Sequence, residues 1–479
     1  MRKLRWLVVV VVLLGAAFLV FQKVRWFGHR ELAAYIAELR ANGEKVTFQE
    51  LVATLSPHTN DSFIKLTNLL MKLGPPPVDI QDLRMARFGE NGRARPLCSS
   101  DFPWTATTNG ASHGSWTELS GRIADASRML GEISRLLERP SPNLGPWTNC
   151  FDRPMCWPEK RRAADWLACA VLVDLRNDRR DAALADIQAL AGLANIHREE
   201  FTMANQMGRA IIGETGLDLT WEALQRSGWS EEQLSAMQRC WETHDFLAAL
   251  ETAMEGERCS PLEMIAICRN EGRAAGIKFK NLQHKGVYQI HVATVMANDA
   301  LYALRHLHTE VGFTRQLRQG QSFSDILKSF RELDERLEKK FRSPTRIFYL
   351  ISAIAIPDYK KAFARAVKAE AARRLAITAI ALRRYELKHG NPAPDLASLV
   401  PEFLSRVPRD CMDGQSLKYR TNPDGSVLLY SVGEDGEDDG GNPASRQPGL
   451  ASSLREGRDM VWPLPTWRSE SRNLQSAAP

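Results

Sequence analysis

The sequence lacks the short motifs by which most metal and catalytic sites are recognised. Its eight cysteines form no CxxC pair and no spacing with histidine that is typical of zinc sites, and its ten histidines form no HExxH pair. No Walker-type phosphate loop is present. Ser112 lies in a Gly-Ala-Ser-His-Gly stretch, but no strand-to-helix context surrounds it, as a nucleophile elbow requires. The sequence therefore discloses no reaction, and these absences favour a binding protein over an enzyme.

Glycine and proline are also too few, at 31 and 24 of 479 residues, for a collagen-like or globally disordered chain. The sequence contains only one long apolar run, which excludes a polytopic transporter. The net charge of +6 arises from 63 basic and 57 acidic residues, and the basic ones are scattered. This pattern predicts no nucleic-acid binding, and the length is enough for roughly three domains of ~150 residues.

The one long apolar run lies at the N-terminus, where residues 6–21 contain no charge and lie between Arg5 and Lys23. At ~1.5 Å per residue the run is ~24 Å long, enough to span a bilayer if the flanking cations extend towards the headgroups. A cleaved signal peptide is the alternative, but the small residues that a cleavage site needs lie inside the run. The run therefore predicts an uncleaved signal-anchor, a single transmembrane helix in a bacterial inner membrane with the body on the periplasmic side.

The body that follows is predicted to be mainly α-helical. Segments 161–175 and 181–197 show helical periodicity and flank a polar turn, and segments 203–225 and 230–255 resemble a second pair. The pairs resemble tetratricopeptide-type arrays, so we expect a helical-hairpin, repeat-like body. Two Pro/Trp-rich segments, 74–116 and 140–158, interrupt it. In the second, Cys150 and Cys156 are spaced so that they could form a disulfide, a question that the sequence leaves open.

The C-terminal part changes character after a long helix that reaches His389. The centre of that helix, residues 375–382, is apolar but too short to span a bilayer, so it should be buried against the body. A short helix is expected over residues 396–404. The β-prone segments 415–421 and 426–432 flank a four-residue loop, which predicts a hairpin. These residues suggest a small α+β module that packs on the apolar helix and is separable from the body.

Residues 374–441 resemble the C-terminal part of the major pseudopilin of type II secretion. That family has a helix ending in a Tyr…Gly…Pro pattern, a Leu-Val-Pro motif, a hairpin and an Asp/Gly-rich loop that binds calcium. The stretch is about one seventh of the chain. Its matching residues are Tyr385, Gly390, Pro392, Leu399, Val400, Pro401, Tyr419, Arg420, Tyr430, Ser431, Val432, Gly433, Asp435 and Gly436. The pseudopilin leader is not matched, and the rest of the chain resembles uncharacterised membrane-anchored bacterial proteins.

The acidic loop places five carboxylates within residues 434–439. The pseudopilin resemblance implies calcium ligands at Asp435 and at Asp438 or Asp439, with backbone carbonyls near residues 432–434. Clustered carboxylates either gather around a hard cation or stay spread in water, so a solvated loop is the alternative. No EF-hand spacing is present.

Together these features predict a mainly α protein with four parts: a membrane anchor (1–30), a helical body (31–356), a long helix with a pseudopilin-like α+β module (357–441) and a disordered tail (442–479). The expected function is a membrane-anchored scaffold or assembly component of the cell envelope that binds other proteins and is related to secretion. The alternative is an envelope hydrolase whose site is assembled from residues far apart in sequence. A deep polar pocket that gathers carboxylates or histidines would favour the hydrolase, and an extended apolar groove would favour the scaffold. The sequence does not tell the oligomeric state.

Overall fold

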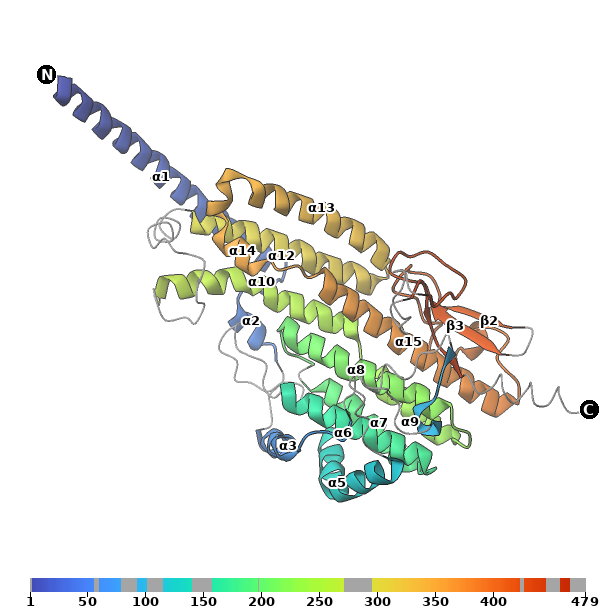
Figure 1. Ribbon diagram of the computed structural model, residues 1–479. Coiled ribbons are helices and arrows are strands. Elements are labelled where there is room, and N and C mark those ends of the chain that lie inside the picture. Colours follow the sequence, from blue (N-terminus) through green and yellow to red (C-terminus); the bar gives the residue numbers. More distant parts are fainter. Residues whose placement is uncertain are drawn as a thin grey trace, which may run out of the picture.

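The computed structural model describes residues 2–55, 60–78, 93–100, 115–139, 157–196, 198–270, 295–422, 426–444 and 457–465. Within these ranges some side chains, chiefly in the first half of the first helix, are not described. The fold is mainly helical, with a small antiparallel sheet near the C-terminus (Figure 1). This confirms the predicted mainly α class. The longer helices of the N-terminal half are α1 (Arg2–Ala41), α3 (Asn60–Lys72), α5 (Trp116–Leu137), α6 (Trp157–Arg176), α7 (Arg180–Asn195) and α8 (Met203–Leu224).

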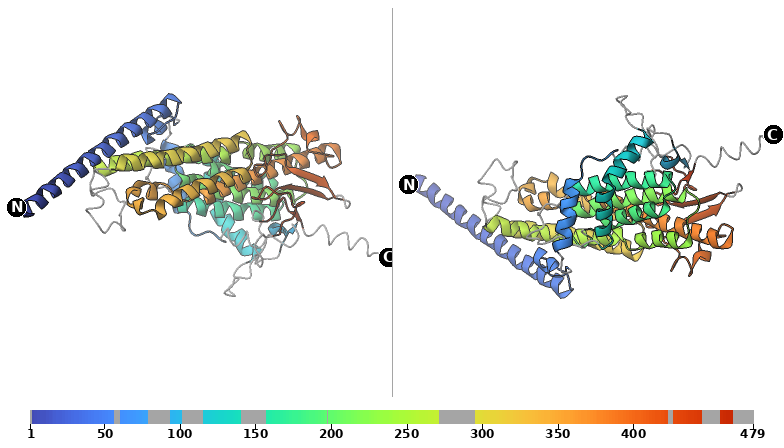
Figure 2. Two further views of the ribbon diagram at one scale, coloured as in Figure 1. Left: turned by 90° about the horizontal axis from the view of Figure 1, so that it is seen from above. Right: turned by 90° about the horizontal axis from the view of Figure 1, so that it is seen from below.

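Helix α1 projects from the body, and its N-terminal end lies far from the other elements (Figures 1 and 2). Its C-terminal half packs on α12 (Met296–Gln319), with Leu32 and Leu39 buried. Among the helical residues that the structure describes, no stretch combines the length and the apolar character required to cross a membrane. The N-terminal transmembrane helix stays a prediction.

The predicted helical pairs are present in the body. Helix α6 packs against α7, and α7 packs against α8, so most side chains of α6 and α8 are buried. The segment expected to be a single helix over 230–255 is divided into α9 (Glu231–Glu242) and α10 (Phe246–Asn270). The break has a local cause, because the carboxylate of Asp245 accepts a hydrogen bond from the backbone N–H of Ala248 and so begins a new helix.

Three further helices close the body. Helix α13 (Phe323–Arg342) buries Phe323, Ile326 and Phe330, and most of its charged side chains are exposed. The short helix α2 (Phe48–Val52) follows α1, and α14 (Leu350–Ala355) lies against α12. Helix α15 (Lys360–His389) runs through the centre of the molecule, packing on α8, α9 and α10 and on the sheet (Figure 1).

The expected hairpin is confirmed: β2 (Lys418–Thr421) pairs antiparallel with β3 (Val427–Ser431). The short helix expected over 396–404 is only a 3₁₀ turn, η4 (Ala397–Leu399). The apolar centre of α15, residues 375–381, is buried as predicted, and it belongs to the same core as the helical body and the residues after 390.

The prediction of a disordered tail from residue 442 onward is wrong for residues 457–465. Strand β4 (Met460–Val461) pairs with β3, and β5 (Leu464–Pro465) pairs with β1 (Arg93–Ala94). The indole N–H of Trp221 also donates to the carbonyl of Pro463 over 2.8 Å. The Pro/Ser/Arg-rich composition of the tail concealed a short apolar segment, and that segment completes the sheet.

Candidate functional site

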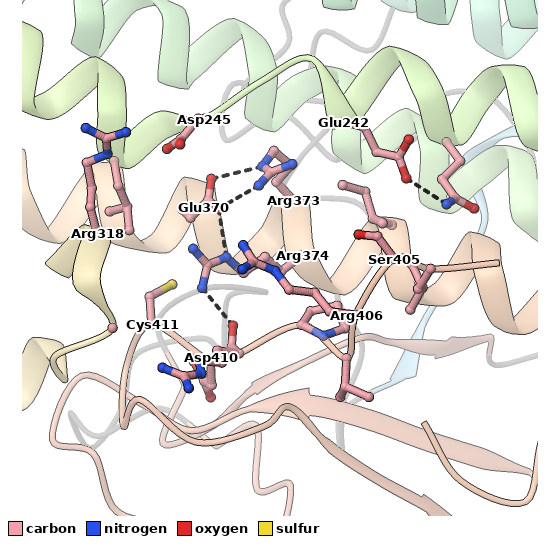
Figure 3. A pocket seen from close by; sticks show the side chains of 18 of the residues that line it. Glu242, Asp245, Arg318, Glu370, Arg373, Arg374, Ser405, Arg406, Asp410 and Cys411 are labelled. Carbon is pink, nitrogen blue, oxygen red and sulfur yellow. Dashed lines mark hydrogen bonds and ion pairs between the residues drawn. The ribbon is translucent and has the colours of Figure 1, made fainter. Parts of the chain in front are cut away.

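A large polar cleft lies between the helical body and the segment 401–411. It has a volume of about 1450 Å³, and α9, α10, α12 and α15 provide its helical wall (Figure 3). Seven arginines and six carboxylates line it, together with the backbone of the loop after η4. No histidine is among the lining residues of this cleft.

The floor of the cleft is a buried ion-pair cluster on α15. The carboxylate of Glu370 is 1% exposed and accepts hydrogen bonds from Arg373 at 2.7 and 2.9 Å and from Arg374 at 2.7 Å. Burial raises the pKa of Glu370, but the charges and hydrogen bonds of Arg373 and Arg374 outweigh it and lower the pKa to about 2. Glu370 therefore stays charged at neutral pH and cannot serve as a general acid or base there.

The same cluster connects the body to the module. A guanidinium N–H of Arg374 donates to the carbonyl of Arg409 over 2.8 Å, and one of Arg373 donates to the carbonyl of Trp241 over 3.2 Å. The amide of Gln238 on α9 donates to the carbonyl of Phe403 over 2.8 Å. The cleft is therefore fixed by polar contacts on both sides of its floor.

Every carboxylate of the cleft has a partner within the protein. Glu251 pairs with Arg315 and Arg318, Glu402 with Lys388, Glu242 with Gln238, and Asp245 with the backbone of α10. Asp410 accepts from the backbone of Met412 and Val432 and from the hydroxyl of Ser431, at 2.7–2.9 Å. Burial is the main reason that the pKa of Asp410 rises to about 6.

Two arginines of the cleft differ from these groups. Arg406 and Arg409 lie on the exposed loop after η4, and within the described residues neither guanidinium has a hydrogen-bond or ion-pair partner. The groups of the cleft that are still available to bind a ligand are therefore cationic. The planar guanidinium group of arginine favours carboxylate or phosphate groups as partners.

The structure does not bring the predicted calcium ligands together. Asp438 accepts hydrogen bonds from the hydroxyl of Tyr430 at 2.9 Å and the backbone of Gly440 at 3.0 Å, whereas Asp439 pairs with Arg458 at 3.2 Å. Asp435 is exposed and accepts from the backbone of Glu437 at 3.1 Å. Among the described residues no group of three or more His, Cys, Asp or Glu side chains could hold a metal.

The three carboxylates are held by separate partners rather than by one another. Oδ1 of Asp438 accepts from Tyr430 and Gly440, and Oδ1 of Asp439 pairs with Arg458. Calcium binding by this loop stays a prediction from the resemblance.

A buried aspartate that the sequence did not single out organises the acidic loop. The carboxylate of Asp459 is 1% exposed and accepts backbone hydrogen bonds from Gly441 at 2.7 Å and Asn442 at 2.9 Å. Asp459 lies seventeen residues beyond Asn442, in a segment that the sequence predicts to be disordered. Its contact with the acidic loop is therefore visible only in the folded structure, where the chain returns to the sheet.

Among the described residues five cysteines are free, and four of them are buried: Cys98, Cys169, Cys259 and Cys411. The possible disulfide between Cys150 and Cys156 lies outside the described residues.

No protein-family model matches this chain, and neither the curated proteins nor the solved structures provide a significant match. The pseudopilin resemblance of residues 374–441 therefore stays a prediction.

Proposed function

We propose that the protein is a single-pass membrane protein of the bacterial envelope that acts as a scaffold or assembly component. Its body lies on the periplasmic side of the inner membrane and binds an acidic segment of a partner protein in the cleft. A role connected with secretion is the form of assembly that the pseudopilin resemblance suggests.

The anchor is supported by the apolar run and by the position of α1. Residues 6–21 carry no charge, and several of their side chains are largely exposed to solvent, with no packing partner to cover them: Trp6, Val11, Val12, Leu13, Leu19 and Val20. Such an apolar stretch on a helix that projects from the body is costly in water and is stabilised by lipid. Lys23 and Arg25 follow the run, and their long side chains can extend from the end of the helix to the headgroup layer.

The observation that carries the binding function is the imbalance between paired carboxylates and unpaired arginines in the cleft. Its carboxylates are satisfied, while Arg406 and Arg409 present two free guanidinium groups at the mouth. An acidic peptide segment supplies what these groups lack, and a volume of about 1450 Å³ accommodates several residues of such a segment.

The hydrolase is a second candidate because the cleft is deep and polar rather than an apolar groove. Asp410 is the one lining carboxyl whose pKa is raised towards neutrality, to about 6, which suits a general base. Its two oxygens, however, already accept hydrogen bonds from Met412, Ser431 and Val432. This arrangement supports binding better than proton transfer.

Binding of an acidic probe tests the proposal. Fluorescence anisotropy of a labelled hexaglutamate peptide, titrated with the full-length protein in detergent, should show saturable binding that weakens as salt is added. The double variant Arg406→Ala, Arg409→Ala should lower the affinity by about tenfold or more, since hydrogen bonds to charged groups contribute roughly 1.5–3 kcal/mol each.

The matched control removes two exposed arginines from α5, Arg128→Ala and Arg135→Ala, and should leave the affinity unchanged. A hexaglutamine peptide controls for contacts other than charge. Equal loss of affinity in both double variants, or equal binding of the two peptides, would contradict binding in the cleft.

A further inference from the structure

Several of the exposed large apolar side chains lie at one end of the body. Beyond residue 21, Trp26 and Phe27 of α1 are 57% and 44% exposed, and Phe348 and Ile354 are 40% and 42% exposed. The rings of Trp26 and Phe27 lie 5.2 Å apart, so that they form one aromatic pair on the helix surface. Exposed apolar side chains that gather in one place mark an interaction site, so the cluster calls for a physical cause.

These side chains lie at the same end of the molecule. The side-chain amide of Asn298, in the first turn of α12, lies 3.4 Å from the carbonyl of Val24 in α1. One turn further along α12, the ring of Tyr302 lies 5.3 Å from that of Tyr349, which directly follows Phe348. Figures 1 and 2 show α14 and the C-terminal end of α13 at the end of the body from which α1 projects.

Cations are in excess beside the apolar side chains, although Arg342 pairs with Glu338 at 2.8 Å. Residues 339–346 include four basic and no acidic side chains, and residues 22–30 include three basic and no acidic ones. Lys339, Arg342 and Arg346 are exposed. Lys340 lies over the rings of Tyr302 and Tyr349, at 5.8 and 5.3 Å. Aromatic rings beside basic residues are typical of surfaces that contact lipid headgroups.

We propose that this end of the body, the juxtamembrane face (Trp26, Phe27, Lys339, Arg346, Phe348 and Ile354), docks on the headgroup layer of a bilayer that contains anionic lipid. The inference rests on the proposed anchor, because α1 holds the face beside the membrane that it enters. Continuity with the apolar run and the excess of cations identify a lipid surface as the occupant. The face then fixes the orientation of the body, and with it the direction in which the cleft opens.

Photocrosslinking of the full-length protein in vesicles tests whether the juxtamembrane face contacts lipid. Benzoylphenylalanine replaces Val12, Phe348, Ile354 or Leu387, one at a time, in vesicles of phosphatidylcholine with or without phosphatidylglycerol, and lipid adducts are measured by mass spectrometry. Positions 348 and 354 should form adducts in vesicles that contain phosphatidylglycerol, and position 12 should do so in both. Position 387, exposed near the opposite end of α15, should form none.

A charge variant makes the test sharper. Lys339→Gln with Arg346→Gln should lower the adduct yield at position 348 on the order of tenfold, since each cation near an anionic surface strengthens attraction several-fold. Lys328→Gln with Lys388→Gln removes the same charge away from the face and should leave the yield unchanged.

Adducts at position 12 but not at 348 or 354 would overturn the docking and leave the anchor standing. Adducts of position 348 to another polypeptide, or equal yields with and without phosphatidylglycerol, would also overturn it. No lipid adduct at position 12 would overturn the anchor itself, and the docking with it.

Discussion

Replacing Ile380 by aspartate is expected to unfold the protein at 25 °C. Ile380 is fully buried in the middle of α15, where that helix packs on α8, α9 and the sheet. The change removes a branched apolar side chain and places a carboxylate in the core without a cation to pair with it. The cost should exceed about 5 kcal/mol, which is comparable with the whole stability of many domains.

The loss should extend to the helical body as well as the C-terminal residues, because both share the core around α15. Urea denaturation followed by circular dichroism, combined with limited proteolysis, measures it. Leu387→Asp is the matched control, since Leu387 is 51% exposed on the same helix and its change should cost less than about 0.5 kcal/mol. A variant Ile380→Asp with the wild-type protease resistance would show that α15 does not hold the two parts together.

Glu370→Gln is expected to destabilise the protein by about 3–5 kcal/mol. The substitution keeps the size of the side chain but removes the negative charge between Arg373 and Arg374, leaving two largely buried guanidinium groups uncompensated. Glu386→Gln is the control, because Glu386 pairs with Arg383 on the surface and such pairs contribute about 0–1 kcal/mol. Chemical denaturation of the two variants at pH 7 compares them.

The same pair should make stability depend on pH. The pKa of Glu370 is lowered from 4.5 to about 2, so its contribution is fully present above pH 4.5 and is lost as the pH falls towards 2. The difference in unfolding free energy between wild type and Glu370→Gln should therefore shrink by up to about 3 kcal/mol across that range. Asp410 acts in the opposite direction, because its pKa is raised, and comparison of the two proteins cancels its effect. A difference that does not change with pH would contradict the ion-pair cluster.

Features specified by neighbouring residues could be predicted from the sequence. The capping boxes of Thr47 with Glu50 and Ser230 with Gln233 are both present, and the hairpin of β2 and β3 has its expected position. Each depends on hydrogen bonds between residues only a few positions apart, or on alternation along two adjacent strands.

Features assembled from distant residues could not be predicted. Glu370 accepts from the backbone of Phe246, and Asp459 from that of Gly441, pairings that no local pattern specifies. The cleft depends on such pairings, because α9, α10, α12, α15 and the loop after η4 meet only in the folded molecule. The contacts of the acidic loop were also beyond prediction: the sequence suggested either one shared cation or a solvated loop, and it did not indicate that Arg458, Tyr430 and Lys368 pair with separate carboxylates of the loop.

Protease digestion of spheroplasts is the most direct test of the proposal that α1 anchors an outward-facing body. A bacterium expresses the full-length chain with an N-terminal tag, protease is added to intact spheroplasts, and the membranes are then extracted with alkaline carbonate. The account predicts that the body is digested, while a short tagged fragment that contains residues 6–21 stays in the membrane pellet. Release of the tagged fragment by carbonate, or a body that resists protease until the spheroplasts are lysed, would contradict it.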